Sequence, residues 1–183
     1  MERTILAVTT DSSCLDDRPL EQALQCVMHT LARQELLSSR LSGRDGAPLL
    51  AGHRYLVVED DYFNAMDIVK ILDKAGATVF GPVCNAERAL EVASDPGFKM
   101  DGAILDIRLN SELVYPAAAE FIRRKTPFVF LSGYERASVP AAFRQVPYLS
   151  KPCSDDELVS ALLAMSRTGS RREGREMTGG VPS

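Results

Sequence analysis

The sequence predicts an α/β fold of the (βα)5 type, in which helices cover both faces of a doubly wound parallel sheet. Two observations predict it. From residue 54 onward, short apolar runs alternate with longer segments of helical periodicity. The runs lack polar residues at alternate positions, which is typical of parallel strands covered on both sides. The chain has 183 residues, of which 45% are hydrophobic and 25% charged, so a largely disordered or fibrous protein is excluded.

The predicted strands and helices alternate along the chain. The strands cover residues 55–58, 78–80, 103–105, 128–131 and 146–149. The helices cover residues 63–75, 86–93, 113–123, about 137–143, and 155–165. Gly76 supplies a stop for the first helix, and Gly81 with Pro82 closes the second strand. Pro140 limits the length of the fourth helix, because proline lacks a backbone N–H donor.

The (βα)5 domain is expected to span residues 53–166, between an N-terminal extension (1–52) and a tail. The tail, 167–183, is rich in Arg, Gly and Ser and buries too little apolar surface to be ordered. Within the extension, apolar residues at helical spacing predict an amphipathic helix over about 19–42, and the glycines of 43–52 indicate a linker. The apolar stripe of this helix fits either a homodimer or docking on the chain's own domain.

The charge and hydropathy of the chain limit its partners. Lys and Arg number 21 and Asp and Glu 25, and this net charge of −4 gives no indication of polyanion binding. No apolar run approaches the roughly 18 residues that a membrane span needs. We therefore expect a cytoplasmic protein that binds neither DNA directly nor a membrane.

Charged and hydroxyl residues follow four of the five predicted strands. Glu59 and Asp60 follow the first strand and Asp106 the third, while Ser132 and Lys151 follow the fourth and fifth. Parallel strands bring their carboxyl ends to one edge of the sheet, so we expect these side chains to lie together. Carboxylates this close favour a cation, and their hard oxygen ligands favour Mg²⁺. A carboxylate beside a metal ion, a lysine and a hydroxyl can accept a phosphoryl group.

These motifs resemble the response-regulator receiver (CheY-like) domain of bacterial two-component systems. The matching motifs are LVVEDD at 56–61, ILD at 104–106, FLSG at 130–133 and YLSKP at 148–152. The segments FVFLSGY at 128–134 and VYP at 114–116 are similar to receivers that accompany HWE-type histidine kinases of alphaproteobacteria. The resemblance covers residues 53–166 and implies the flavodoxin-like strand order 2-1-3-4-5.

The resemblance also implies a role for each site residue. Asp106 corresponds to the phosphoacceptor, and Ser132 and Lys151 correspond to the residues that contact the phosphoryl group. Ser132 and Tyr148 correspond to the pair that rearranges on phosphorylation. The Mg²⁺ ligands would be Glu59, Asp60, Asp106 and the backbone carbonyl of Arg108.

A chain with these roles is expected to be a response regulator without a DNA-binding output domain. A histidine kinase or a histidine phosphotransfer protein would phosphorylate Asp106. The product would signal through contacts with a downstream protein, or act as a shuttle or sink in a phosphorelay. We expect slow self-dephosphorylation rather than enzymatic turnover. Two departures from the commonest receiver pattern, in residues 107–112 and in the short stretch around Pro140, indicate an altered output face.

Two alternatives come from other functional classes. A Mg²⁺-dependent phosphatase of the haloacid-dehalogenase type also uses an aspartyl nucleophile, but it needs a second Asp two residues later, where this chain has Arg108. A flavodoxin-like FMN-binding protein needs a Ser/Thr/Gly phosphate loop after the first strand. Here that position holds three acids, which would repel the phosphate.

Overall fold

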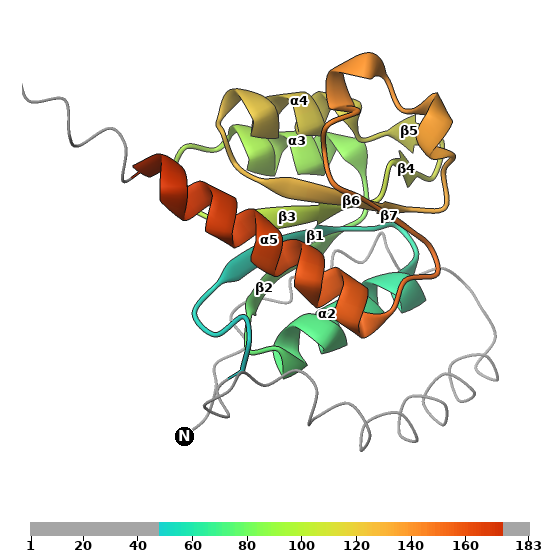
Figure 1. Cartoon of the computed structure of the whole chain (residues 1–183). Coiled ribbons are helices and arrows are strands. Elements are labelled where there is room, and N and C mark those ends of the chain that lie inside the picture. The colour runs from blue at the N-terminus through green and yellow to red at the C-terminus, as the bar shows by residue number, and fades with distance from the viewer. Residues whose placement is uncertain (1–47, 174–183) are drawn as a thin grey trace, which may run out of the picture.

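Five parallel strands form the central sheet of the computed structural model, which describes residues 48–173 and their side chains as far as Ser166. The strands are β1 (Arg54–Val58), β2 (Thr78–Val83), β3 (Gly102–Leu105), β6 (Phe128–Ser132) and β7 (Tyr148–Ser150). They pair in the order β2-β1-β3-β6-β7 (Figure 1). This is order 2-1-3-4-5 of the predicted strands, so the predicted fold class is confirmed. The helix predicted over 19–42 lies outside the described residues.

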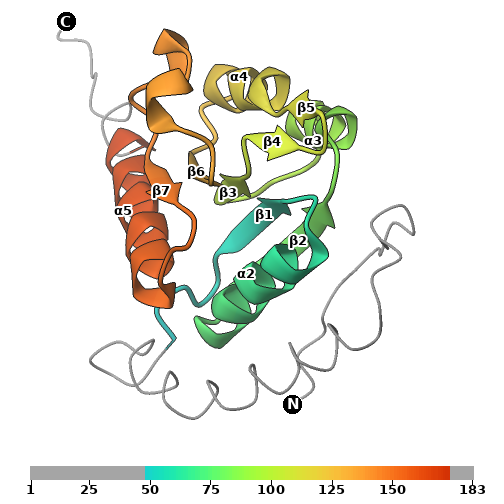
Figure 2. The same ribbon diagram turned by 90° about the vertical axis from the view of Figure 1, so that its right-hand side faces the viewer.

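Helices cover both faces of this sheet (Figure 2). Helices α2 (Tyr62–Lys74) and α5 (Asp155–Glu173) lie on one face, and α3 (Ala86–Ser94) and α4 (Tyr115–Arg123) lie on the other. Among residues 48–173, no helix combines the length and the apolarity that crossing a bilayer requires.

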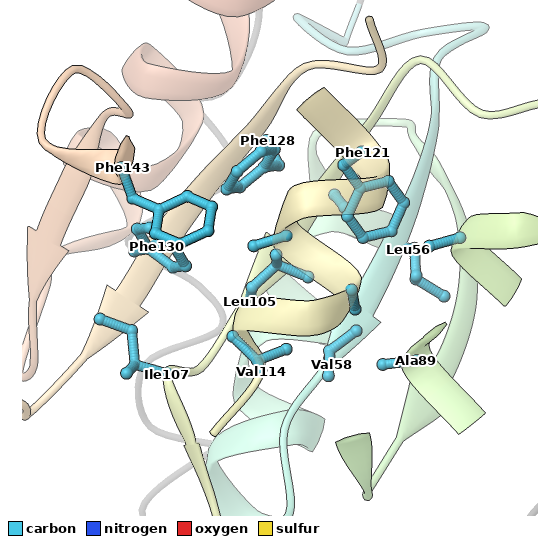
Figure 3. Close-up of a cluster of buried hydrophobic side chains, with 14 of the residues drawn as sticks. Leu56, Val58, Ala89, Leu105, Ile107, Val114, Phe121, Phe128, Phe130 and Phe143 are labelled. Carbon is cyan, nitrogen blue, oxygen red and sulfur yellow. The ribbon is translucent and has the colours of Figure 1, made fainter. Parts of the chain in front are cut away.

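Neighbouring residues of the central strands enter two different cores. Leu105 and Phe130 pack with Phe121 of α4 in the core between the sheet and the α3–α4 layer (Figure 3). Ile104, next to Leu105 in the chain, packs with Leu158 of α5 in the other core. Complete burial of each such side chain contributes about 1.5–3 kcal/mol. The strands are apolar on both faces because neither face meets water.

Helix α2 lies within one residue of its predicted bounds because both of its ends carry strong signals. Asp61 is its N-cap, and the Asp61 carboxylate accepts a hydrogen bond from the backbone N–H of Asn64 at 2.9 Å. Gly76 follows the helix with φ of 85°, a left-handed conformation that glycine adopts without strain. Asp61 therefore serves the helix, whereas Glu59 and Asp60 precede it at the edge of the sheet.

The prediction of a fourth helix over about 137–143 is wrong. Two short 3-10 helices stand in its place, η2 (Arg136–Ser138) and η3 (Ala141–Phe143). Pro140 separates them, because a proline pushes the preceding residue into extended backbone. Val139 accordingly has φ of −68° and ψ of 128°. The connection between β6 and β7 is therefore irregular.

A small hairpin that the sequence analysis did not predict follows Asp106. Strands β4 (Arg108–Leu109) and β5 (Glu112–Leu113) pair in antiparallel fashion. Asn110 begins the two-residue turn with φ of 55°, a conformation that Asn tolerates better than most residues. Because the hairpin uses these residues, α4 begins at Tyr115 rather than at the predicted residue 113.

Other predicted boundaries also differ from the structure. Strand β2 continues through Gly81 and Pro82 to Val83, because it is an edge strand, where a proline is tolerated. Leu50, within the predicted linker, is fully buried against the α2–α5 side of the sheet. Helix α5 extends beyond the predicted end at 165 to Glu173.

Candidate functional site

The carboxyl ends of four strands bring the predicted site residues to one edge of the sheet. Glu59 follows β1, Asp106 follows β3, Ser132 ends β6 and Lys151 follows β7. Asp60, next to Glu59, lies in the same cluster. The Lys151–Pro152 peptide bond is cis. All five side chains predicted from the strand ends therefore meet in space.

Lys151 joins two of the carboxylates. Its Nζ lies 2.5 Å from Oδ2 of Asp106 and 2.6 Å from Oε2 of Glu59. Burial opposes the charged ammonium, but the hydrogen bonds that it donates to Asp106 and Glu59 outweigh the burial, so the pKa of Lys151 is raised. Lys151 is therefore a fixed positive charge at the centre of the site.

Glu59 is the most deeply buried of the acidic residues, and only 2% of its surface is exposed. Burial raises its pKa from 4.5 to about 7, although the hydrogen bond and charge of Lys151 act in the opposite direction. Asn64 also donates a hydrogen bond from Nδ2 to Oε1 of Glu59 at 3.3 Å. Glu59 therefore titrates near neutral pH, and an added cation at the site would favour its ionised form.

Both carboxylate oxygens of Asp106 have donors. Oδ1 accepts a hydrogen bond from Oγ of Ser132 at 2.5 Å and one from the backbone N–H of Arg108 at 3.2 Å. Oδ2 faces Lys151. The Oγ of Ser132 accepts in turn from the backbone N–H of Tyr134 at 3.2 Å. The position of the carboxylate is thus set by donors from Ser132, Lys151 and the backbone of Arg108.

Asp60 connects the acidic cluster to the hairpin after β3. Its Oδ2 accepts a hydrogen bond from the backbone N–H of Asn110 at 2.7 Å. Ligand oxygens of Glu59, Asp60 and Asp106 all lie within 4.8 Å of one another, which suits a hard divalent cation. The backbone carbonyl of Arg108 stays a predicted ligand. The contact of Asn110 was not predicted; an Asn in a short polar stretch after a strand signals a turn, but not what its backbone N–H contacts.

Tyr148 reaches the site through the main chain of β6. Its hydroxyl donates to the carbonyl of Ser132 at 3.1 Å and also lies against the carbonyl of Tyr134. The ring is half-buried, and burial raises the pKa of the Tyr148 phenol. The predicted pair, Ser132 and Tyr148, is therefore in contact. The Ser132 hydroxyl donates a hydrogen bond to Asp106, and the Ser132 carbonyl accepts one from the Tyr148 hydroxyl. The involvement of Tyr134 was not predicted.

Solved structures of other proteins resemble this chain. SdrG from Sphingomonas melonis Fr1 is 36% identical, and the match covers 62% of this chain and 95% of SdrG with a TM-score of 0.55. The N-terminal domain of a response regulator/sensory box/GGDEF 3-domain protein from Carboxydothermus hydrogenoformans is 27% identical. That match covers 65% of this chain and 98% of the other, with a TM-score of 0.57.

A third similar structure contains a metal ion. The receiver domain of sensor histidine kinase PA1611 from Pseudomonas aeruginosa PAO1, solved with a magnesium ion coordinated in the active site cleft, is 25% identical. The match covers 64% of this chain and 99% of that domain, with a TM-score of 0.51. No protein-family model and no curated protein matches the chain.

Proposed function

Because the chain belongs to the response-regulator receiver family, we propose that Asp106 accepts a phosphoryl group from a phosphohistidine of a histidine kinase or phosphotransfer protein. One observation carries this proposal: the Asp106 carboxylate lies between the Ser132 hydroxyl and the Lys151 ammonium, at 2.5 Å from each, beside two further acids. This arrangement provides a nucleophile together with donors for the phosphoryl oxygens.

The proposed reaction is a simple transfer of a phosphoryl group. A carboxylate oxygen of Asp106 forms a P–O bond while the P–N bond of the phosphohistidine breaks. The electron pair of that bond stays on the imidazole nitrogen, which then takes up a proton. Lys151 and Ser132, which contact the carboxylate before transfer, would then face the oxygens of the new acyl phosphate. Phosphoryl transfer depends mainly on such positioning and charge neutralisation.

The acidic cluster fits Mg²⁺, because its ligands are carboxylate oxygens that lie close together. Glu59, Asp60, Asp106 and the backbone carbonyl of Arg108 would hold the ion. The bound ion would neutralise charge that develops on the phosphoryl oxygens. Lys151 alone is one positive charge against three carboxylates, so the cluster retains negative charge for a divalent cation to offset.

Phosphorylation is proposed to act through Ser132 and Tyr148. The Ser132 hydroxyl contacts Asp106, while the Ser132 carbonyl accepts the Tyr148 hydroxyl, so any movement of Ser132 toward a phosphoryl oxygen changes the position of Tyr148. This contact can shift the population between two packings of the β6–β7 connection. We propose that the output is a protein contact, with a relay or sink role as the second possibility, rather than enzymatic turnover.

The class of donor is proposed from sequence motifs. Segments 128–134 and 114–116 are similar to receivers that accompany HWE-type histidine kinases, so a kinase of this type is the proposed partner. The exchange is proposed to take place in the cytoplasm. The first segment contains Ser132 and Tyr134 of the site, and Tyr115 of the second segment stacks on Phe143 with ring centroids 5.1 Å apart.

The test is labelling of the whole chain with acetyl phosphate and Mg²⁺, read as intact mass and as base-labile phosphate. We expect a single phosphoryl group on the wild type, none on Asp106→Asn, and unchanged labelling on Asp67→Asn, an exposed aspartate of α2. Labelling that persists in Asp106→Asn would refute the proposal. Continuous release of many phosphates per chain would instead indicate a phosphatase.

A further inference from the structure

A pocket of about 560 Å³ lies between β6, β7 and the two 3-10 helices. Phe130, Val139 and Phe143 form its apolar wall, and Figure 3 shows Phe130 and Phe143 side by side. Its volume lies within the range of about 300–1,000 Å³ that is typical of ligand pockets. The pocket borders the segment in which Pro140 replaces a regular helix with two short turns.

The pocket has two basic residues at its rim and no acidic residue among those that line it. Arg136 and Arg144 are both exposed, and the Arg136 guanidinium lies 5.5 Å from the ring centre of Tyr148. In the described part of the chain, neither guanidinium forms an ion pair. By contrast, Arg88 and Arg123 each pair with a glutamate on their own helix. Positive charge is therefore available at this rim, although the chain as a whole is negative.

The pocket is also in contact with the candidate phosphorylation site. Tyr148 lines the pocket, and its hydroxyl donates to the carbonyl of Ser132. The hydroxyl of Ser132 donates to Asp106. A group that binds in the pocket therefore touches a residue that is two hydrogen bonds away from the Asp106 carboxylate.

The geometry points to a docking site for an acidic segment of a partner protein. Aliphatic or aromatic side chains of that segment fill the space against Phe130 and Phe143, and its carboxylates lie against Arg136 and Arg144. The exposed rim favours side chains presented by a protein over an enclosed small molecule, because small-molecule pockets usually bury most of the ligand. The inference deepens the proposed function, since it names the chemistry of the partner and rests on output through a protein contact.

The experiment uses the full chain and two pools of short peptides. One pool intersperses Leu and Phe with Asp and Glu, and the matched pool replaces the acids with Lys and Arg. We expect saturable binding of the acidic pool, measured by fluorescence anisotropy, and amide shifts confined to residues 130–148. Arg136→Gln combined with Arg144→Gln removes both rim charges and should weaken binding about tenfold.

The matched control is Arg88→Gln combined with Arg123→Gln, which removes two charges from α3 and α4 outside the pocket. It should weaken binding less than about twofold, because exposed charges at a distance are screened. Equal losses in the two double variants, equal binding of the basic pool, or an absence of saturable binding would overturn the inference. Two other occupants would also overturn the inference. One is residues 1–47 of the same chain, if they already fill the pocket. The other is a second copy of the chain, if it dissociates from the pocket when the rim arginines are removed.

Asp106→Asn separates this inference from the proposed function. That variant cannot accept a phosphoryl group but keeps the pocket, so the acidic pool should bind it. If the wild type labels with phosphate but the acidic pool does not bind, the inference alone fails. If the acidic pool binds but no chain labels, the proposed function fails and the pocket remains a docking site.

Discussion

The two halves of the sheet, β2-β1-β3 and β6-β7, connect their strands in different ways. In one half, β1, β2 and β3 are joined by the regular helices α2 and α3, each with a side-chain N-cap, Asp61 or Asn85. In the other, β6 and β7 are joined by η2 and η3, which have no side-chain caps. The proposed chemistry uses carboxylates that follow β1 and β3, in the half with regular helices. The proposed output uses the irregular connection between β6 and β7. The comparison suggests that rigid elements position the site and that a loosely built segment responds to it.

The largest expected effect comes from core truncation in a regular helix, α4, compared with truncation in the 3-10 helix η3. Phe121 of α4 is 1% exposed, whereas Phe143 of η3 is 8% exposed and lines the pocket. Phe121→Ala should lower the free energy of unfolding by about 4 kcal/mol, because it leaves an enclosed cavity. Phe143→Ala should cost about half as much, because water from the pocket can fill the space. Urea unfolding measures the free energy of unfolding of both variants. Equal losses would contradict the difference between α4 and η3.

The pH dependence of stability tests the titration of Glu59, which follows β1, in the metal-free protein. The pKa of Glu59 is about 7 in the folded chain and 4.5 in the unfolded chain, so folding favours the protonated carboxyl. Its stabilising contribution is complete below the unfolded pKa and is lost as pH rises through about 7. The loss is at most about 3 kcal/mol.

Glu59→Gln should remove this dependence. Urea midpoints measured in EDTA from acidic to neutral pH should fall for the wild type and stay flatter for the variant. Asp67→Asn, which changes an exposed carboxyl of α2, serves as the control. Parallel curves for wild type and Glu59→Gln would show that Glu59 does not titrate in this range.

Loss of the central lysine should have an intermediate effect. Lys151→Met leaves Glu59 and Asp106 without their counter-ion and should cost about 2 kcal/mol at about pH 8. The cost should shrink at about pH 5, because protonation of Glu59 removes one of the unpaired charges. Lys70→Met, which breaks an exposed pair with Asp67, should cost less than about 0.5 kcal/mol. A pH-independent cost would indicate lost packing rather than lost charge.

The smallest expected effect concerns Pro140. Pro140→Ala restores a backbone donor between η2 and η3 and should change the free energy of unfolding by less than about 1 kcal/mol. Carbon chemical shifts should show more helical conformation across 136–143, because the restriction on Val139 is removed. Unchanged shifts would mean that packing around the pocket, and not the proline, excludes the helix.

The acidic and basic site residues were predictable because each follows a strand. Glu59, Asp106 and Lys151 come directly after apolar runs, and a parallel sheet brings such positions to one edge. Asn110 was not predicted, because its role comes from a backbone N–H that reaches Asp60, 50 positions away in the chain. A backbone donor has no signature in the sequence, and only the path of the hairpin places it there.

The sequence by itself determined the alternation of strands and helices, the strand order through its motifs, and the acids at the strand ends. These depend on local hydrophobic periodicity and on the geometry that all parallel sheets share. Tertiary structure alone decided the hairpin after β3 and the pocket with its two arginines. Such features depend on whether a marginal local preference is reinforced by packing, and that requires contacts between residues far apart in the chain.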